Sequence, residues 1–169
     1  MTIAAMLLPE FDQEMAATRK MLERVPEDKL DWRVHEKSNT IGWVANHLIE
    51  IAGWTGGTLT ATEWDLNPPG GPKYETPNLR TRAEMLAQFD QFVAEGRAAI
   101  EQTDDAAFGE NWSLLDNGTV LFTMPRLVVI RSFVLNHSIH HRGHLCVYYR
   151  LNDVSVPPLY GPSADEAWG

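Results

Sequence analysis

Apolar residues recur every three or four positions in four separate stretches of this chain. A helix with one buried face produces this spacing, so each stretch predicts a helix that packs against others. We expect helices over about 6–25, 41–64, 81–103 and 125–151. Four helices of roughly 20 residues each, with a strand signal in only one short segment, favour an all-α fold and a four-helix bundle.

The segments between the expected helices carry loop and turn signals. Residues 67–78 hold four prolines and two glycines, a density that excludes a helix there. The dipeptide Asn117-Gly118 lies between two apolar runs. Because both residue types tolerate a positive φ, it predicts a small β-hairpin over 111–123, just before the last helix. We expect one domain over 1–169, with the bundle over about 1–151 and an irregular tail over 152–169.

Charge and hydropathy exclude several classes of protein. The chain has 14 Lys and Arg against 23 Asp and Glu, a formal net charge of -9, which argues against a nucleic-acid partner. No stretch approaches the ~18 consecutive apolar residues of a membrane helix, so we expect no membrane partner. The first residues lack the basic start of a signal peptide. With Cys146 as the single cysteine, no internal disulfide can form, and we expect a reducing, cytoplasmic location.

Four of the six histidines fall between His137 and His144. On a regular helix His137, His140, His141 and His144 lie within about 100° of arc. The same sector carries apolar residues, so it faces the core of a bundle. Imidazole groups buried there need polar partners or a ligand.

The spacing of these histidines is that of a metal-chelating helix. His137 and His141 are one turn apart, and His140 and His144 form a second such pair, so the spacing alone does not decide between them. His47, in the second expected helix, is the best third ligand. The alternative for His47 alone is an ordinary core histidine with a hydrogen-bond partner. A site of three histidines with open positions would suit Zn, Ni or a similar divalent ion.

Four segments of the chain resemble the DinB-like family. The most specific is the last-helix string Asn136-His-Ser-Ile-His-His-Arg-Gly-His-Leu145. The others are residues 27–38, residues 40–48 with His47, and residues 156–163 of the tail. They occur in the expected order along most of the chain. The members of this family are small four-helix bundles, unrelated to the translesion polymerase that shares the name.

The resemblance implies a metal site formed by His47, His137 and His141. It also implies a homodimer, a Zn or Ni ion, and chemistry with a low-molecular-weight thiol such as bacillithiol or mycothiol. We therefore expect a small-molecule substrate and a metal-dependent thiol S-transferase. The alternatives are a metal-dependent hydrolase and a non-catalytic metal-binding protein of a stress response. Where the family often has Gln, this chain has His144, which is a neighbour of the site or an alternative ligand.

Other residues near the expected site have simpler interpretations. For Arg142 an ion pair is favoured over an anchor for a substrate carboxylate. Cys146 lies on a different sector of the last helix and is expected to be a buried, inert thiol, so any reacting thiol would come from outside. Trp43 and Trp54 flank His47, and ordinary packing is favoured over a role in lining the metal pocket.

Overall fold

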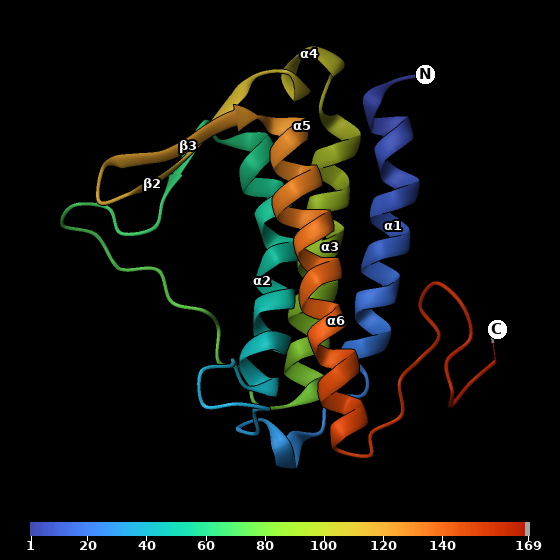
Figure 1. The fold of residues 1–169 in the computed structure, drawn as a ribbon. Coiled ribbons are helices and arrows are strands. Elements are labelled where there is room, and N and C mark those ends of the chain that lie inside the picture. Colours follow the sequence, from blue (N-terminus) through green and yellow to red (C-terminus); the bar gives the residue numbers. More distant parts are fainter. Residues whose placement is uncertain (168–169) are drawn as a thin grey trace.

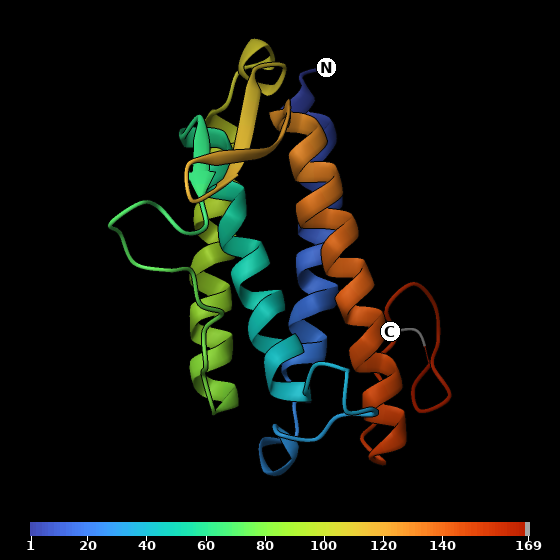
Figure 2. The same cartoon turned by 60° about the vertical axis from the view of Figure 1, so that its left-hand side comes forward.

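Four long helices lie side by side in the computed structural model, which describes residues 1–167 (Figure 1). Three of them are α1 (Ile3–Leu22), α2 (Ile41–Thr60) and α3 (Arg82–Gln102). The view turned by 60° shows the same four helices side by side (Figure 2), where α2 packs on both α3 and the fourth long helix, and α1 packs on the same two helices. The prediction of a helix bundle is confirmed, and the helix ends differ from the expected ones by a few residues.

The fourth long helix is built from three consecutive segments. They are α5 (Arg126–Val129), a π-helical segment (Ile130–Leu135) and α6 (Asn136–Leu151). In the π segment the Asn136 amide donates to the carbonyl of Arg131, five residues back. This wider turn ends directly before His137. The prediction of one uniform helix is wrong here, because a wheel of about 100° per residue does not describe a π turn.

Threonine side chains begin the first three long helices. The hydroxyl oxygens of Thr2, Thr40 and Thr81 each accept a hydrogen bond from the backbone amide three residues later. At Thr81 the side chain of Glu84 accepts from the cap amide in return, which completes a capping box. Such caps satisfy amides that have no partner inside the helix, so they define where each helix starts.

A three-stranded sheet lies beside one end of the bundle (Figures 1 and 2). Strands β2 (Asn111–Asp116) and β3 (Thr119–Pro125) are antiparallel. The turn between them has φ of 50° at Asn117 and 75° at Gly118. The predicted hairpin is therefore confirmed, and the third strand, β1 (Glu63–Asp65), is an addition to it.

Strand β1 replaces the expected end of the second helix. Helix α2 stops at Thr60, and Trp64 lies in β1, which pairs in parallel with β2. The Asp65 carboxylate accepts hydrogen bonds from the backbone amides of Asn117 at 3.0 Å and Gly118 at 2.7 Å. The prediction of a helix to residue 64 is wrong, because these pairings come from residues about 50 positions away in the chain, which local periodicity does not report.

The Pro- and Gly-rich loop after β1 returns along the bundle to the start of α3 (Figure 1). Its far end is fastened to α2 by Asn46. The Asn46 side chain accepts from the Leu79 amide at 2.8 Å and donates to the Leu79 carbonyl at 3.1 Å. The loop therefore passes beside α2, where it brings Tyr74 and Thr76 to the level of His47.

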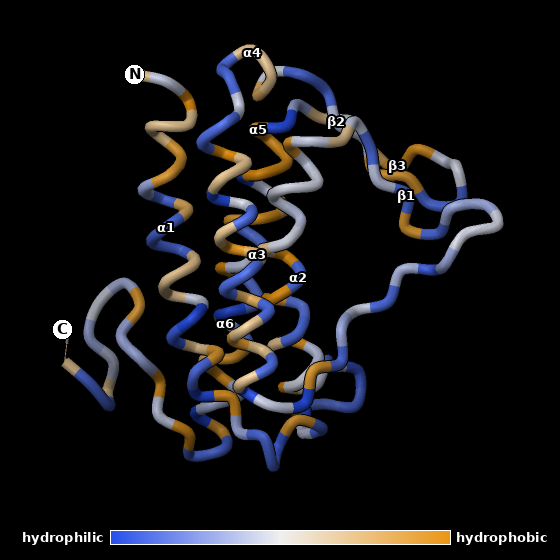
Figure 3. Tube along the Cα trace, turned by 180° about the vertical axis from the view of Figure 1, so that it is seen from behind, coloured by the Kyte–Doolittle hydropathy of each residue, from blue (hydrophilic) through white to orange (hydrophobic). Residues whose placement is uncertain are grey.

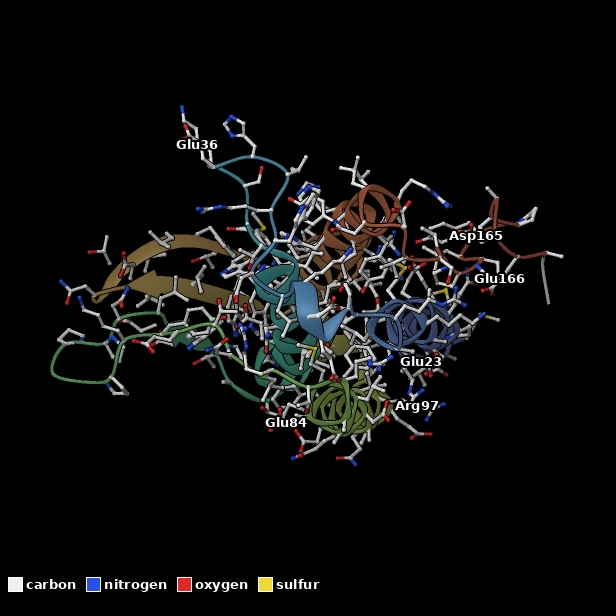
Figure 4. All side chains as sticks on the ribbon, turned by 90° about the horizontal axis from the view of Figure 1, so that it is seen from below. Glu23, Glu36, Glu84, Arg97, Asp165 and Glu166 are labelled. Atoms are coloured by element: carbon white, nitrogen blue, oxygen red, sulfur yellow. The ribbon has the colours of Figure 1, made fainter. Side chains whose placement is uncertain are left out.

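The apolar core lies between the helices and centres on α2. Ile41, Val44, Leu48 and Ile51 of this helix are fully buried. Apolar and polar segments alternate along each helix in the hydropathy view (Figure 3). The charged residues labelled in Figure 4, which are Glu23, Glu36, Glu84, Arg97, Asp165 and Glu166, lie around the outside of the bundle seen end-on. Among residues 1–167, no helix has the length and apolar character needed to cross a membrane.

A buried ion pair lies inside the bundle, between α1 and α6. The Arg142 guanidinium is fully buried and forms an ion pair with the Glu14 carboxylate. It also donates to the Glu14 carbonyl at 2.8 Å and to the Thr18 hydroxyl at 3.2 Å. Tyr160 of the tail donates to Glu14 at 2.7 Å and completes the network. This confirms the ion-pair interpretation of Arg142 and shows how the irregular tail is held; residues 168–169 of the expected tail lie outside the described residues.

The buried pair predicts a large stability effect at Glu14. Glu14→Ala leaves the Arg142 charge buried without its partner, so we expect the free energy of unfolding to fall by about 3–5 kcal/mol. Glu10, one turn earlier on α1, pairs with Arg131 where both side chains are more than 40% exposed. Glu10→Ala is the matched control and should cost less than about 1 kcal/mol. Urea unfolding monitored by circular dichroism measures both, and equal losses would contradict the assigned role of Glu14.

Candidate metal centre

Three histidine side chains converge between α2 and α6. The Nε2 atom of His137 lies 2.9 Å from Nε2 of His141 and 3.4 Å from Nε2 of His47. His47 and His141 are buried and His137 is half-buried. The two α6 histidines lie one turn apart, and His47 faces them from the middle of α2. The structure thus brings together the three residues expected from the sequence, in a group that could hold a metal ion.

Glu50 fixes the orientation of His47. Its carboxylate accepts from Nδ1 of His47, one turn earlier on α2. The same carboxylate accepts from the Tyr74 hydroxyl and, at 3.3 Å, from the Thr76 hydroxyl. Because a carboxylate only accepts, Nδ1 of His47 carries the proton and Nε2 keeps its lone pair toward His137. A carboxylate behind a histidine is the usual support of a metal ligand.

Aromatic rings enclose the histidine group. Trp43 stacks on His47 with ring centroids 4.5 Å apart and an angle of 25° between the planes. Trp54 lies edge-on to His47 at 5.5 Å and close to His137 at 5.7 Å. The expectation of ordinary packing is incomplete for Trp43, which packs on a site residue. It is wrong for Trp54, which lines the cavity described below.

Burial keeps the two α6 histidines neutral. Loss of solvent, and then the proximity of His47, lower the pKa of His137 from 6.5 to about 4. The same two causes lower the pKa of His141 to about 3. Nδ1 of His141 is also buried and makes no hydrogen bond within residues 1–167. At neutral pH each of these rings is therefore uncharged and keeps one ring nitrogen with a free lone pair, as a metal ligand must.

The other histidine pair of α6 forms, together with His141, a second group that could hold a metal ion. His140 is exposed and His144 is half-buried, and their ring centroids are 4.4 Å apart. His141 is the only residue this group shares with the His47 group. The sequence left both pairs open as ligands. The structure places His137 and His141 opposite His47 and directs His140 toward solvent.

A cavity of about 500 Å³ adjoins the histidine group. His47 and His137 form part of its wall, beside Trp54. The rest comes from the sheet, from the π segment through Phe133 and Val134, and from the C-terminal half of α2. This volume falls in the ~300–1,000 Å³ range of small-molecule sites. The cavity arises where the sheet meets the bundle, so no local sequence pattern reports it.

Neither Cys146 nor Arg142 is part of the three-histidine group. Burial raises the pKa of the Cys146 thiol, which favours its neutral, unreactive form. Arg142 is engaged by Glu14 and the tail and offers no anchor to a substrate. The residues that sequence reasoning missed are Tyr74 and Thr76, because they reach Glu50 from a loop without regular structure. Glu50 lies only three residues after His47, but the sequence alone does not show that its carboxylate reaches the His47 ring.

Comparison with known proteins decides the family. The model of the DinB superfamily matches residues 10–145, which include all three histidines. The chain belongs to the DinB superfamily. This DinB-superfamily membership confirms the resemblance that we noted from the sequence.

Three proteins similar to this DinB-superfamily chain come from Bacillus species. A protein of Bacillus subtilis named uncharacterized protein YrdA is 25% identical over 167 residues, covering 94% of this chain and 89% of YrdA. The crystal structure of a DinB-like protein from Bacillus cereus has a TM-score of 0.71 at 22% identity, covering 94% of this chain and 98% of that one. The DinB-like protein YjoA of Bacillus subtilis has a TM-score of 0.69 at 16% identity, covering 92% and 97%. The two structures confirm the DinB-like fold.

The lowered histidine pKa values predict how stability depends on pH. In unfolded chains His137 and His141 bind protons below pH 6.5, whereas in the fold they do so only near pH 4 and pH 3. The free energy of unfolding of chelator-treated protein should therefore be highest above pH 6.5 and fall as the pH drops toward about 4. Chemical denaturation at a series of pH values measures this dependence.

A histidine substitution provides the control for this pH dependence. His141→Gln removes one of the two titrating groups and should roughly halve the slope below pH 6.5. His35→Gln changes an exposed loop residue and should leave the slope unchanged. A slope that is the same in wild type and His141→Gln would show that the buried rings do not cause it.

Proposed function

We propose that His47, His137 and His141 bind a divalent metal ion and that the protein is a metal-dependent enzyme acting on a small molecule. The observation that carries the proposal is the convergence of the Nε2 atoms of three histidines beside a cavity of about 500 Å³, with His47 and His137 in its wall. A divalent cation between the rings would bind one lone pair from each ring, with each Nε2 unprotonated.

The donor set fits a borderline ion such as Zn or Ni. Neutral imidazoles suit these metals, and three protein ligands leave a position open for a substrate. When bound, such an ion supplies Lewis acidity and stabilises an anionic sulfur or oxygen beside it. Glu50 orients His47, Trp43 covers the His47 ring, and the apolar cavity limits water around the reacting group.

The reaction that we propose is the transfer of an external low-molecular-weight thiol to an electrophile. The sulfur of a low-molecular-weight thiol forms a bond to an electrophilic carbon, the leaving group departs with its electron pair, and the thiol proton passes to solvent. Cys146 does not line the cavity and its thiol stays protonated, so it does not supply the sulfur. We propose in addition that the protein is a cytoplasmic homodimer without a nucleic-acid partner.

Metal content tests the ligand assignment. Purified protein should contain about one divalent ion per chain, and His47→Ala and His137→Ala should weaken metal affinity by at least about 100-fold. His140→Ala is the matched control on α6 and should retain the ion, because His140 is exposed and is not one of the three proposed ligands. Elemental analysis and competition with a chromophoric chelator measure both. Retention of metal in His137→Ala and its loss in His140→Ala would assign the ion to the other group.

Turnover tests the reaction. Metal-loaded protein should consume a low-molecular-weight thiol in the presence of an electrophile, chelation should abolish this, and restored metal should recover it. Cys146→Ser should keep the activity, because the reacting sulfur is external. Consumption of an ester or amide without thiol would replace the transferase with the hydrolase. Full metal occupancy without either reaction would favour the non-catalytic metal-binding protein.

A further inference from the structure

The walls of the cavity are largely apolar and rich in aromatic rings. Six of the lining residues are aromatic: Trp54, Trp64, Tyr74, Trp112, Phe122 and Phe133. Their rings form two connected sets. Trp64 lies 6.0 Å from Trp54 and 5.0 Å from Tyr74, and Phe122 stacks on Phe133 at 4.7 Å. Such surfaces bind a planar apolar molecule by burial of area and by ring contacts.

Polar groups are confined to particular parts of this wall. His47 and His137 supply the metal-facing part, and the Tyr74 hydroxyl is already committed to Glu50. Among the lining residues that the structure describes, the only carboxylate is that of Glu63, which is exposed on β1. Within the described chain, no Lys or Arg lines the cavity. A carboxylate or phosphate inside it would lose its hydration without gaining a cation from these walls.

Gly57 leaves space where the cavity adjoins α2. A Cβ built at Gly57 meets no atom within 4 Å, whereas one at Gly53 would lie 3.1 Å from the Phe92 ring. Helix packing therefore accounts for Gly53 but not for Gly57. A glycine inside a helix costs about 1 kcal/mol relative to alanine. Gly57 lines the cavity, and a larger side chain there would take up cavity space. Keeping the cavity open therefore explains why a glycine stands at this position.

We propose that the cavity binds a neutral, apolar molecule with an aromatic or conjugated body, and that this molecule is the electrophilic substrate. Its role as substrate rests on the proposed function, because its reactive carbon would have to lie at the His47–His137 end. Its binding rests only on the cavity. A charged or strongly hydrophilic thiol does not fit these walls, so the thiol is a second substrate that stays outside the apolar part.

Binding of two matched probes to chelator-treated protein tests the inference. The neutral probe is N-phenyl-1-naphthylamine, and its anionic counterpart is 1-anilinonaphthalene-8-sulfonate. We expect the neutral probe to bind about tenfold more tightly or better, as followed by its fluorescence. Equal affinities, or a preference for the anion, would overturn the inference.

Two glycine variants locate the probe. Gly57→Leu should weaken binding of the neutral probe by about tenfold, with a smaller loss for Gly57→Ala. Gly56→Leu is the control, since a Cβ at Gly56 also meets nothing within 4 Å but Gly56 does not line the cavity. Gly56→Leu should leave the affinity for the neutral probe unchanged. Circular dichroism checks that each variant is folded. Unchanged binding in folded Gly57→Leu would overturn the inference.

The outcomes separate this inference from the proposed function. Selective probe binding to a protein that takes up no metal would refute the metal site and leave the neutral apolar ligand supported. Metal uptake with no selective probe binding would refute the ligand and leave the metal site supported. If the wild type binds no probe and Gly57→Leu converts a dimer to a monomer, a second copy of the chain covers the cavity and the inference is wrong.

Discussion

Burial of three imidazole rings between α2 and α6 is the constraint on which the candidate site depends. A histidine in water is protonated about half the time at pH 6.5, and loss of solvent shifts His137 and His141 far toward the neutral form. Three neutral rings with facing nitrogens cannot satisfy all of one another's hydrogen-bonding groups. A chain that keeps them together must therefore hold them by other contacts or stabilise them with a ligand.

The other contacts come from outside the two helices. Glu50 orients His47, and the loop residues Tyr74 and Thr76 hold Glu50. Asn46 anchors the same loop near its end through Leu79. The Pro- and Gly-rich segment between β1 and α3 is thus a support of the histidine group as well as a connection. Its irregular backbone is what lets a tyrosine and a threonine reach one carboxylate from the side.

The sequence predicted the parts of the fold that depend on local pattern. The apolar period predicted the four long helices, the Asn117-Gly118 turn predicted the hairpin, and the spacing of His137 and His141 predicted a chelating pair. It failed where residues distant in sequence decide the outcome. Trp64 lies in a strand because β1 pairs with β2. The π turn before His137 cannot be seen on a helical wheel that assumes a regular α-helix. The cavity and the Glu50 network depend on the packing of loop and sheet against α2, so no single segment encodes them.

Two neighbouring residues of α6 show the difference between a structural and a functional polar group. Arg142 is buried on the α1 side, where Glu14, Thr18 and Tyr160 provide the carboxylate, carbonyl and hydroxyl partners seen in the structure. His141 is buried on the α2 side, where its Nδ1 has no hydrogen-bond partner within residues 1–167 and its Nε2 faces another imidazole. One helix thus carries a satisfied polar group and an incompletely satisfied one side by side. The Nε2 atom of His141 is the one that the proposed metal ion would bind, whereas its Nδ1 would still need a hydrogen-bond acceptor.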